Sequence, residues 1–172
     1  AAVFDPDKLS WLNEHYIKNT PPEELVPHLE PCLISTGILQ EGHDLGVAEI
    51  AKVIPSLNQR AKTLVEMAEK SAFYFKKEVE FDEKAKAKFL TAEAKPLLEK
   101  TIAGLSQLEN FSAEEIEELF KKVVEEEGVK LGKLAQPVRV ALTGTTVSPG
   151  IYDVILLLGK EETLARLNNA LL

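Results

Sequence analysis

Apolar residues recur along this chain at the spacing of a helix, and no turn-bounded run alternates with the two-residue period of a strand. The pattern is clearest between Ser112 and Glu126, where five apolar residues form one stripe: Ile116, Leu119, Phe120, Val123 and Val124. Ser112 and Glu115 match a capping box at the start of this segment, and Gly128 is placed to end it. We therefore expect an all-α fold without a sheet.

The same reasoning predicts helices elsewhere, over residues 8–17, 22–33, 57–75, 82–89, from 96, 133–143, 148–159 and from about 160. In the 133–143 helix, Pro137 is tolerable only near the first turn. Ser148 is expected to cap the next helix, with Pro149 at its first position and Gly159 at its end. The spacing is not heptad, which favours packed globular bundles, and a charged stretch at 76–81 marks the most plausible seam between them.

Composition narrows the class of protein further. The 172 residues are enough for a core without metal or disulfides, and the one cysteine, Cys32, cannot form an internal disulfide, which favours the cytoplasm. No apolar run approaches the length that spans a bilayer. The net charge of −8 argues against non-specific binding of polyanions, but the acidic excess is concentrated at 109–127, with eight glutamates and two lysines. An acidic chain can still present a basic face to nucleic acid.

Residues for independent catalysis are scarce. There is no Gly-x-Ser-x-Gly elbow and neither of the two glycine-rich nucleotide-binding loops. His28 and Cys32 are four residues apart on an expected helix, but no second pair completes a metal site, so we predict neither catalytic residues nor a metal. The paired glutamates are expected on solvated helix faces.

Two places are candidates for binding. Arg60 lies at the border of the apolar face of the expected 57–75 helix, where an arginine is either a surface residue with a buried stem or a planar fork for a base or phosphate. The stretch from Gln136 to Ile151 joins two helices through Gly, Thr and Ser and contains Arg139. It is either a plain turn or a site for an anion or unstacked bases.

Three separated blocks of the sequence resemble the C-terminal region of bacterial glutamyl-tRNA synthetase. The first is residues 3–17, with Asp5, Lys8, Trp11, Asn13 and Tyr16. The second includes Arg60, Thr63, Leu64 and the Tyr74–Phe75 pair. The third runs from Gly132 to Gly144 and continues through Ser148–Gly150 and Leu157–Glu161. Together they cover essentially the whole chain in family order.

The resemblance implies an aminoacyl-tRNA synthetase, a ligase of protein biosynthesis, whose catalytic half is absent here. Neither a HIGH-like nor a KMSKS-like motif is present, so ATP and Mg²⁺ would be cofactors of the parent, and this fragment would hold none and would not be an enzyme. By the same resemblance, residues 1–20 end the stem-contact region, and residues 21–79 and 80–172 are two packed helical anticodon-binding subdomains.

Carried over by position, Arg60 matches the arginine that reads the third anticodon base and prefers C to G. Gln136 and Arg139 match loop-facing positions, and Ser148, Pro149 and Ile151 match positions that pack on the first two anticodon bases. The family often has Thr and Leu at the positions of Ser148 and Ile151. Lys8 and Trp11 match positions near the inner side of the tRNA, where contact to the backbone is independent of sequence.

The leading hypothesis is therefore recognition of the tRNA(Glu) anticodon by a cytoplasmic monomer, with no DNA or membrane partner. The alternative is a helical protein-interaction module that docks a basic partner on the acidic 109–127 face.

Overall fold

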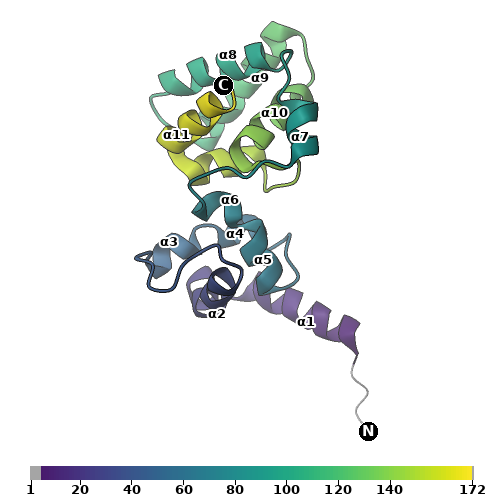
Figure 1. The fold of residues 1–172 in the computed structure, drawn as a ribbon, viewed down its shortest axis with the longest axis vertical. Coiled ribbons are helices and arrows are strands. Elements are labelled where there is room, and N and C mark those ends of the chain that lie inside the picture. Colours follow the sequence, from purple (N-terminus) through teal and green to yellow (C-terminus); the bar gives the residue numbers. More distant parts are fainter. Residues whose placement is uncertain (1–4, 172) are drawn as a thin grey trace. The chain divides into compact units, whose positions relative to one another are not determined.

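The computed structural model describes residues 5–171, which form helices joined by short turns (Figure 1). No strand occurs within those residues, so the all-α prediction is confirmed. The chain divides into two compact units, residues 1–76 and residues 77–172. The division falls inside the charged stretch at 76–81.

Unit 1 consists of α1 (Pro6–Asn19), α2 (Pro22–Ser35), α3 (Val47–Ala51), α4 (Ile54–Leu57), α5 (Leu64–Lys70) and α6 (Ala72–Phe75). Helix α2 packs against α3 and α5. The fully buried side chains of this core include Leu25, Leu29, Leu33, Ile50, Ile54, Leu57 and Met67. Pro27 and Pro31 lie inside α2 but on its exposed side, one turn apart, so they leave the buried face of the helix unchanged.

Unit 2 consists of α7 (Glu83–Phe89), α8 (Lys95–Gln107), α9 (Ala113–Glu127), α10 (Leu131–Thr143) and α11 (Ile151–Asn169). Helix α10 packs against all four of the others. Its apolar side chains Leu134, Val138, Val140, Ala141 and Leu142 are buried completely. Ser112 caps α9 as predicted and accepts a hydrogen bond from the Glu115 N–H at 3.2 Å, and Asp82 caps α7 by accepting one from the Ala85 N–H at 2.7 Å.

The sequence prediction was wrong in two details of unit 2. Pro137 is buried in the second turn of α10 rather than near its start, because the helix begins at Leu131. Its ring fills space in the core at the expense of one backbone hydrogen bond. Ser148 does not cap α11, which begins two residues later than expected with Gly150 as its N-cap. Gly159 does end a helical segment: its φ of +76° breaks α11 in the middle.

Gly144 lies in close contact with the segment at the start of unit 2. Gly144 follows α10 with φ +77°, the left-handed region that glycine adopts without steric cost. A Cβ at this position would lie 2.0 Å from the carbonyl oxygen of Glu80. The Gly144 carbonyl accepts a hydrogen bond from the Asp82 N–H at 2.9 Å. The segment that leads into α7 is therefore packed directly on the end of α10.

Candidate nucleic-acid interface

Arg60 lies in a turn between α4 and α5, which we call the Arg60 turn (residues 58–63). The expected continuous helix over 57–75 was wrong here, because the chain leaves α4 after Leu57 and does not resume a helix until Leu64. The Leu57 carbonyl accepts hydrogen bonds from the N–H groups of Arg60 (2.8 Å) and Ala61 (3.0 Å). Ala61 is buried in unit 1 although it is outside a helix, which explains why the apolar spacing continued across the break.

Thr63 and Glu66 create the break. Thr63 has extended backbone and accepts a hydrogen bond from the Glu66 N–H at 3.1 Å, so it caps α5. The Glu66 carboxylate accepts hydrogen bonds from the Lys62 N–H at 2.8 Å and from the Lys70 ammonium at 2.6 Å. The Lys70 ammonium also donates to the Arg60 carbonyl oxygen. Glu66 and Lys70 thus stabilise the turn through its main-chain groups. The pattern Thr63-x-x-Glu66 is a capping signal that can be recognised in the sequence.

The hydrogen bond from Lys70 lowers the pKa of Glu66 below its ordinary value of 4.5. A carboxylate whose pKa is lowered by folding contributes stability above that ordinary value, and the contribution is lost as the pH falls through the lowered pKa. The contacts that hold the Arg60 turn are therefore intact at neutral pH.

Replacing Thr63 by alanine is expected to lower the free energy of unfolding by about 1 kcal/mol, because the N-cap hydroxyl of α5 is lost. Thr63→Ser keeps the hydroxyl and should unfold close to the wild type. Urea unfolding followed by circular dichroism measures both, and equal stability of the two variants would contradict the capping role.

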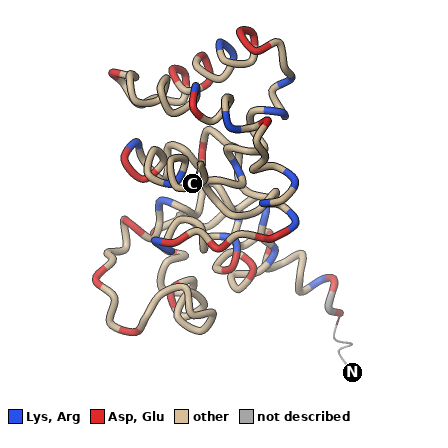
Figure 2. Tube along the Cα trace, turned by 45° about the horizontal axis from the view of Figure 1, so that its top comes forward, with Lys and Arg blue, Asp and Glu red and all other residues tan. Residues whose placement is uncertain are grey.

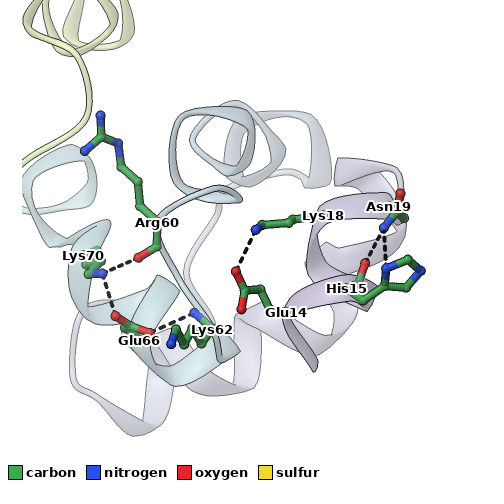
Figure 3. Close-up of polar contacts among 8 residues, drawn as sticks. All are labelled: Glu14, His15, Lys18, Asn19, Arg60, Lys62, Glu66 and Lys70. Atoms are coloured by element: carbon green, nitrogen blue, oxygen red, sulfur yellow. Dashed lines mark hydrogen bonds and ion pairs between the residues drawn. The ribbon is translucent and has the colours of Figure 1, made fainter. Parts of the chain in front are cut away.

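The Arg60 side chain is exposed and extends away from Lys70 and Glu66 (Figure 3). Within residues 5–171, its guanidinium forms no hydrogen bond or ion pair with unit 1. A guanidinium presents five donors in a fixed fork that suits a base edge or a phosphate. Arg60 therefore combines a fixed main chain with an uncommitted side chain, as a recognition residue requires.

A second candidate surface lies between α10 and α11, in residues 144–150, which we call the α10–α11 turn. The Arg139 side chain stabilises this turn by hydrogen bonds to Ser148 and Pro149. Its Nη1 atom donates to the Pro149 carbonyl oxygen at 2.7 Å and to the Ser148 carbonyl oxygen at 3.3 Å, and also to the Ser148 hydroxyl. The Ser148 hydroxyl in turn donates to the Pro149 carbonyl at 2.9 Å. In this structure Arg139 shapes the turn.

The predicted contact residues of the turn differ in exposure. Pro149 and Ile151 are buried, and Ser148 and Gln136 are half-buried. The exposed side chains are Thr145, Thr146 and Val147, and Val147 is 76% exposed, more than any other large apolar residue described. Sequence reasoning did not single out Val147, although an apolar residue inside a Gly-Thr-Thr-Ser stretch is a recognisable signal. The contacts of Gln136, Ser148, Pro149 and Ile151 with the anticodon stay predictions.

Helix α1 carries the remaining predicted positions, Lys8 and Trp11. Both are exposed, and Trp11 is stacked on His15 with ring centroids 5.5 Å apart. Beside them, Leu9, Leu12 and Tyr16 are also exposed, so α1 presents both a cation and apolar rings to its surroundings. This combination suits contact with a phosphate backbone.

The glutamates of the acidic 109–127 stretch are exposed or half-buried and are partly neutralised within unit 2. Lys100 of α8 pairs with Glu126 at 3.7 Å and also with Glu127, and Lys121 pairs with Glu117 at 2.7 Å. The Glu115 carboxylate accepts from the Asn110 amide at 3.2 Å instead of returning to the Ser112 N–H, as a full capping box would. Figure 2 shows lysines and arginines interspersed among acidic residues along the trace.

The histidines and the cysteine are dispersed over unit 1. His28 is exposed on α2, and the Cys32 thiol lies 3.6 Å from the His28 carbonyl oxygen. His43 pairs with Glu30, with 3.0 Å between its Nε2 atom and the carboxylate. Across the residues that the structure describes, no group of three His, Cys, Asp or Glu side chains could hold a metal ion.

Comparison with known proteins decides which family has this architecture. Residues 23–171 match the family model described as the anticodon binding domain. The chain belongs to this family. The anticodon-binding domain is 48% identical over 171 residues to a glutamate–tRNA ligase of Syntrophobacter fumaroxidans and 46% identical over 170 residues to one of Thermodesulfovibrio yellowstonii. These alignments cover 99% of the chain but 36% and 37% of the relatives, so it spans about a third of their length.

A solved structure agrees with this assignment. A glutamate–tRNA ligase of Elizabethkingia meningosepticum in complex with its amino acid superposes with a TM-score of 0.83 at 28% identity, over 99% of this domain and 33% of that chain. The resemblance to the glutamyl-tRNA synthetase region is thereby confirmed. No described helix of the domain is both long enough and apolar enough to span a bilayer.

Proposed function

We propose that this domain recognises the anticodon of tRNA(Glu) as part of a glutamate–tRNA ligase. The observation that carries the proposal is the Arg60 turn: a braced main chain presents an uncommitted guanidinium in a chain whose family binds anticodons. Ligation of glutamate, with its ATP and Mg²⁺, is assigned in this proposal to the parts of the relatives that the chain does not cover.

In this proposal the two units divide the reading of the anticodon. Arg60 of unit 1 contacts the third base and favours C over G, and the α10–α11 turn of unit 2 contacts the first two bases. Sequence-specific recognition of RNA targets unstacked bases in loops, through edge hydrogen bonds and apolar contacts. The fork of Arg60 supplies the first kind of contact, and the exposed Thr145, Thr146 and Val147 supply groups of both kinds.

Arg60→Gln is expected to abolish the preference for C over G at the third anticodon position. One specific side chain–base pairing provides about 1–3 kcal/mol of discrimination, which is roughly a 5- to 150-fold ratio of dissociation constants. Fluorescence anisotropy with two anticodon stem–loops that differ only at this base measures the ratio.

Lys62→Ala is the matched control, because Lys62 is also an exposed cation of the Arg60 turn. It should weaken binding of both stem–loops equally and keep their ratio. An Arg60→Gln variant that keeps the wild-type ratio would exclude Arg60 as the reading residue. Absence of binding to either stem–loop by the wild-type chain would refute the proposed function itself.

A further inference from the structure

Two hollows on unit 2 meet at α7, and both are lined by Lys88 and Phe89. The smaller, about 300 Å³, is also lined by Lys84, Gln136 and Thr146, which brings it to the α10–α11 turn. The larger, about 450 Å³, continues past Pro96 and Pro137 to Lys133 at the start of α10. We call these two hollows together the lysine groove.

The positive charges of the groove are available for a ligand. Lys84, Lys88 and Lys133 are exposed, and among the residues described none of them forms an ion pair with an acidic side chain. Lys84 and Lys88 are four residues apart on α7, so they lie on one face of the helix. The Lys88 ammonium lies 5.2 Å from the ring centroid of Phe89.

Two of the acidic groups that line the groove are already engaged. The Asp82 carboxylate accepts the Ala85 N–H as the cap of α7, and Glu127 is paired with Lys100. Glu93 is the third acidic residue at the wall of the larger hollow. The lining therefore holds three lysines without an ion-pair partner in the described part of the chain and three carboxylates, of which Glu127 is paired with Lys100. On a chain whose net charge is −8, a polyanion is expected to contact these lysines locally and not to be attracted by the protein as a whole.

Phe89 supplies an aromatic ring to the groove. Half-buried Phe89 lines both hollows, and the Gln136 Oε1 atom is buried without a hydrogen-bond partner among residues 5–171. A positively charged groove that contains an aromatic side chain is the arrangement by which proteins hold single-stranded nucleic acid.

We propose that the lysine groove binds the sugar–phosphate backbone of the single-stranded RNA that continues from the bases at the α10–α11 turn, with Lys84, Lys88 and Lys133 contacting phosphates. This proposal rests on the proposed function, because the RNA in question is the anticodon loop. It assigns a sequence-independent part of the affinity to α7 and to the start of α10, which the family resemblance did not assign to tRNA.

The test removes the three charges together. Each phosphate contact to single-stranded RNA contributes about 0.7 to the slope of log affinity against log salt concentration, so the variant Lys84→Ala/Lys88→Ala/Lys133→Ala should lose about 2 from the slope. When salt rises from 50 to 200 mM, the fold-decrease in the affinity of the wild type should then be roughly 16 times the fold-decrease in the affinity of the variant. Anisotropy with a tRNA(Glu) anticodon stem–loop measures both quantities, and the C-over-G ratio should stay unchanged.

Two companion variants make the result specific. Lys121→Ala/Lys122→Ala removes two charges from α9 that line neither hollow and should keep the wild-type slope. Lys84→Arg/Lys88→Arg/Lys133→Arg keeps the charge and should restore binding, which a structural role of the lysines would not predict. Circular dichroism confirms that each variant is folded.

Failure of the groove assignment and failure of the proposed function would give different results. A groove variant with the same affinity and slope as the α9 control overturns the groove assignment and leaves the proposed function standing. A groove variant that alters the C-over-G ratio overturns the assignment of these lysines to phosphates. If the wild-type chain does not bind the stem–loop even at low salt, both the proposed function and the groove assignment fall.

Discussion

Replacing Gly144 by alanine is expected to destabilise unit 2 by about 3 kcal/mol. Two costs add at this position. An L-residue in the left-handed region costs roughly 1–2 kcal/mol, and overpacking costs about 1–3 kcal/mol. The second cost applies because the new Cβ would lie 2.0 Å from the Glu80 carbonyl oxygen, a backbone atom that cannot rotate away. Relief of that clash would strain the hydrogen bond from the Asp82 N–H to Gly144.

Gly128→Ala is the matched control, because Gly128 ends α9 with φ +63° but a Cβ there meets no atom within 4 Å. It should carry only the backbone cost of roughly 1–2 kcal/mol. Thermal and urea unfolding followed by circular dichroism compare the two variants. Equal losses of stability would show that the contact between Gly144 and Glu80 does not constrain unit 2.

Arg139→Met is expected to lower the free energy of unfolding of unit 2 by about 2 kcal/mol and to reduce binding of anticodon stem–loops. Hydrogen bonds from charged groups each contribute about 1.5–3 kcal/mol, and a partly buried acceptor that loses its partner costs a similar amount. The Ser148 and Pro149 carbonyl oxygens are the acceptors at risk. Methionine keeps much of the apolar stem, so the change isolates the guanidinium.

The Arg139 variants also separate shaping of the turn from direct contact with RNA. If Arg139 shapes the turn, Arg139→Lys should be intermediate in both stability and binding, because one ammonium replaces only part of the fork. Hydrogen–deuterium exchange of residues 144–150 should rise in parallel. Loss of binding with unchanged stability and exchange would instead place the guanidinium on the RNA.

The helices were predictable because their signals are local. Asp82 and Ser112 cap the helices that follow them, and the apolar stripe of α9 lies within one segment. The break at the Arg60 turn was missed because Leu57 and Ala61 are both buried at helical spacing, although the chain between them is not helical. Apolar residues four positions apart can both be buried whether the chain between them is a helix or a turn. The Thr63 and Glu66 pair distinguishes the two cases, because it marks the start of a new helix.

The candidate site was predictable only in part, for a related reason. Arg60 and the α10–α11 turn were identified by sequence position and by family resemblance. The lysine groove was not, because Lys88 and Lys133 come from helices separated by more than forty residues and meet only through the packing of α7 on α10. The internal role of Arg139 depends on how the turn folds back over α10, which no local pattern encodes.

The Arg60 turn is stabilised independently of the side chain that occupies position 60. Lys70 and Glu66 grip peptide groups only, at Arg60 and Lys62, and none of those grips uses the side chain at position 60. A substitution of Arg60 therefore changes the exposed side chain while the hydrogen bonds that hold the turn are kept. We expect a broad set of residues to be tolerated there without loss of fold, so that, under the proposed function, one substitution is enough to shift the preference for the third anticodon base.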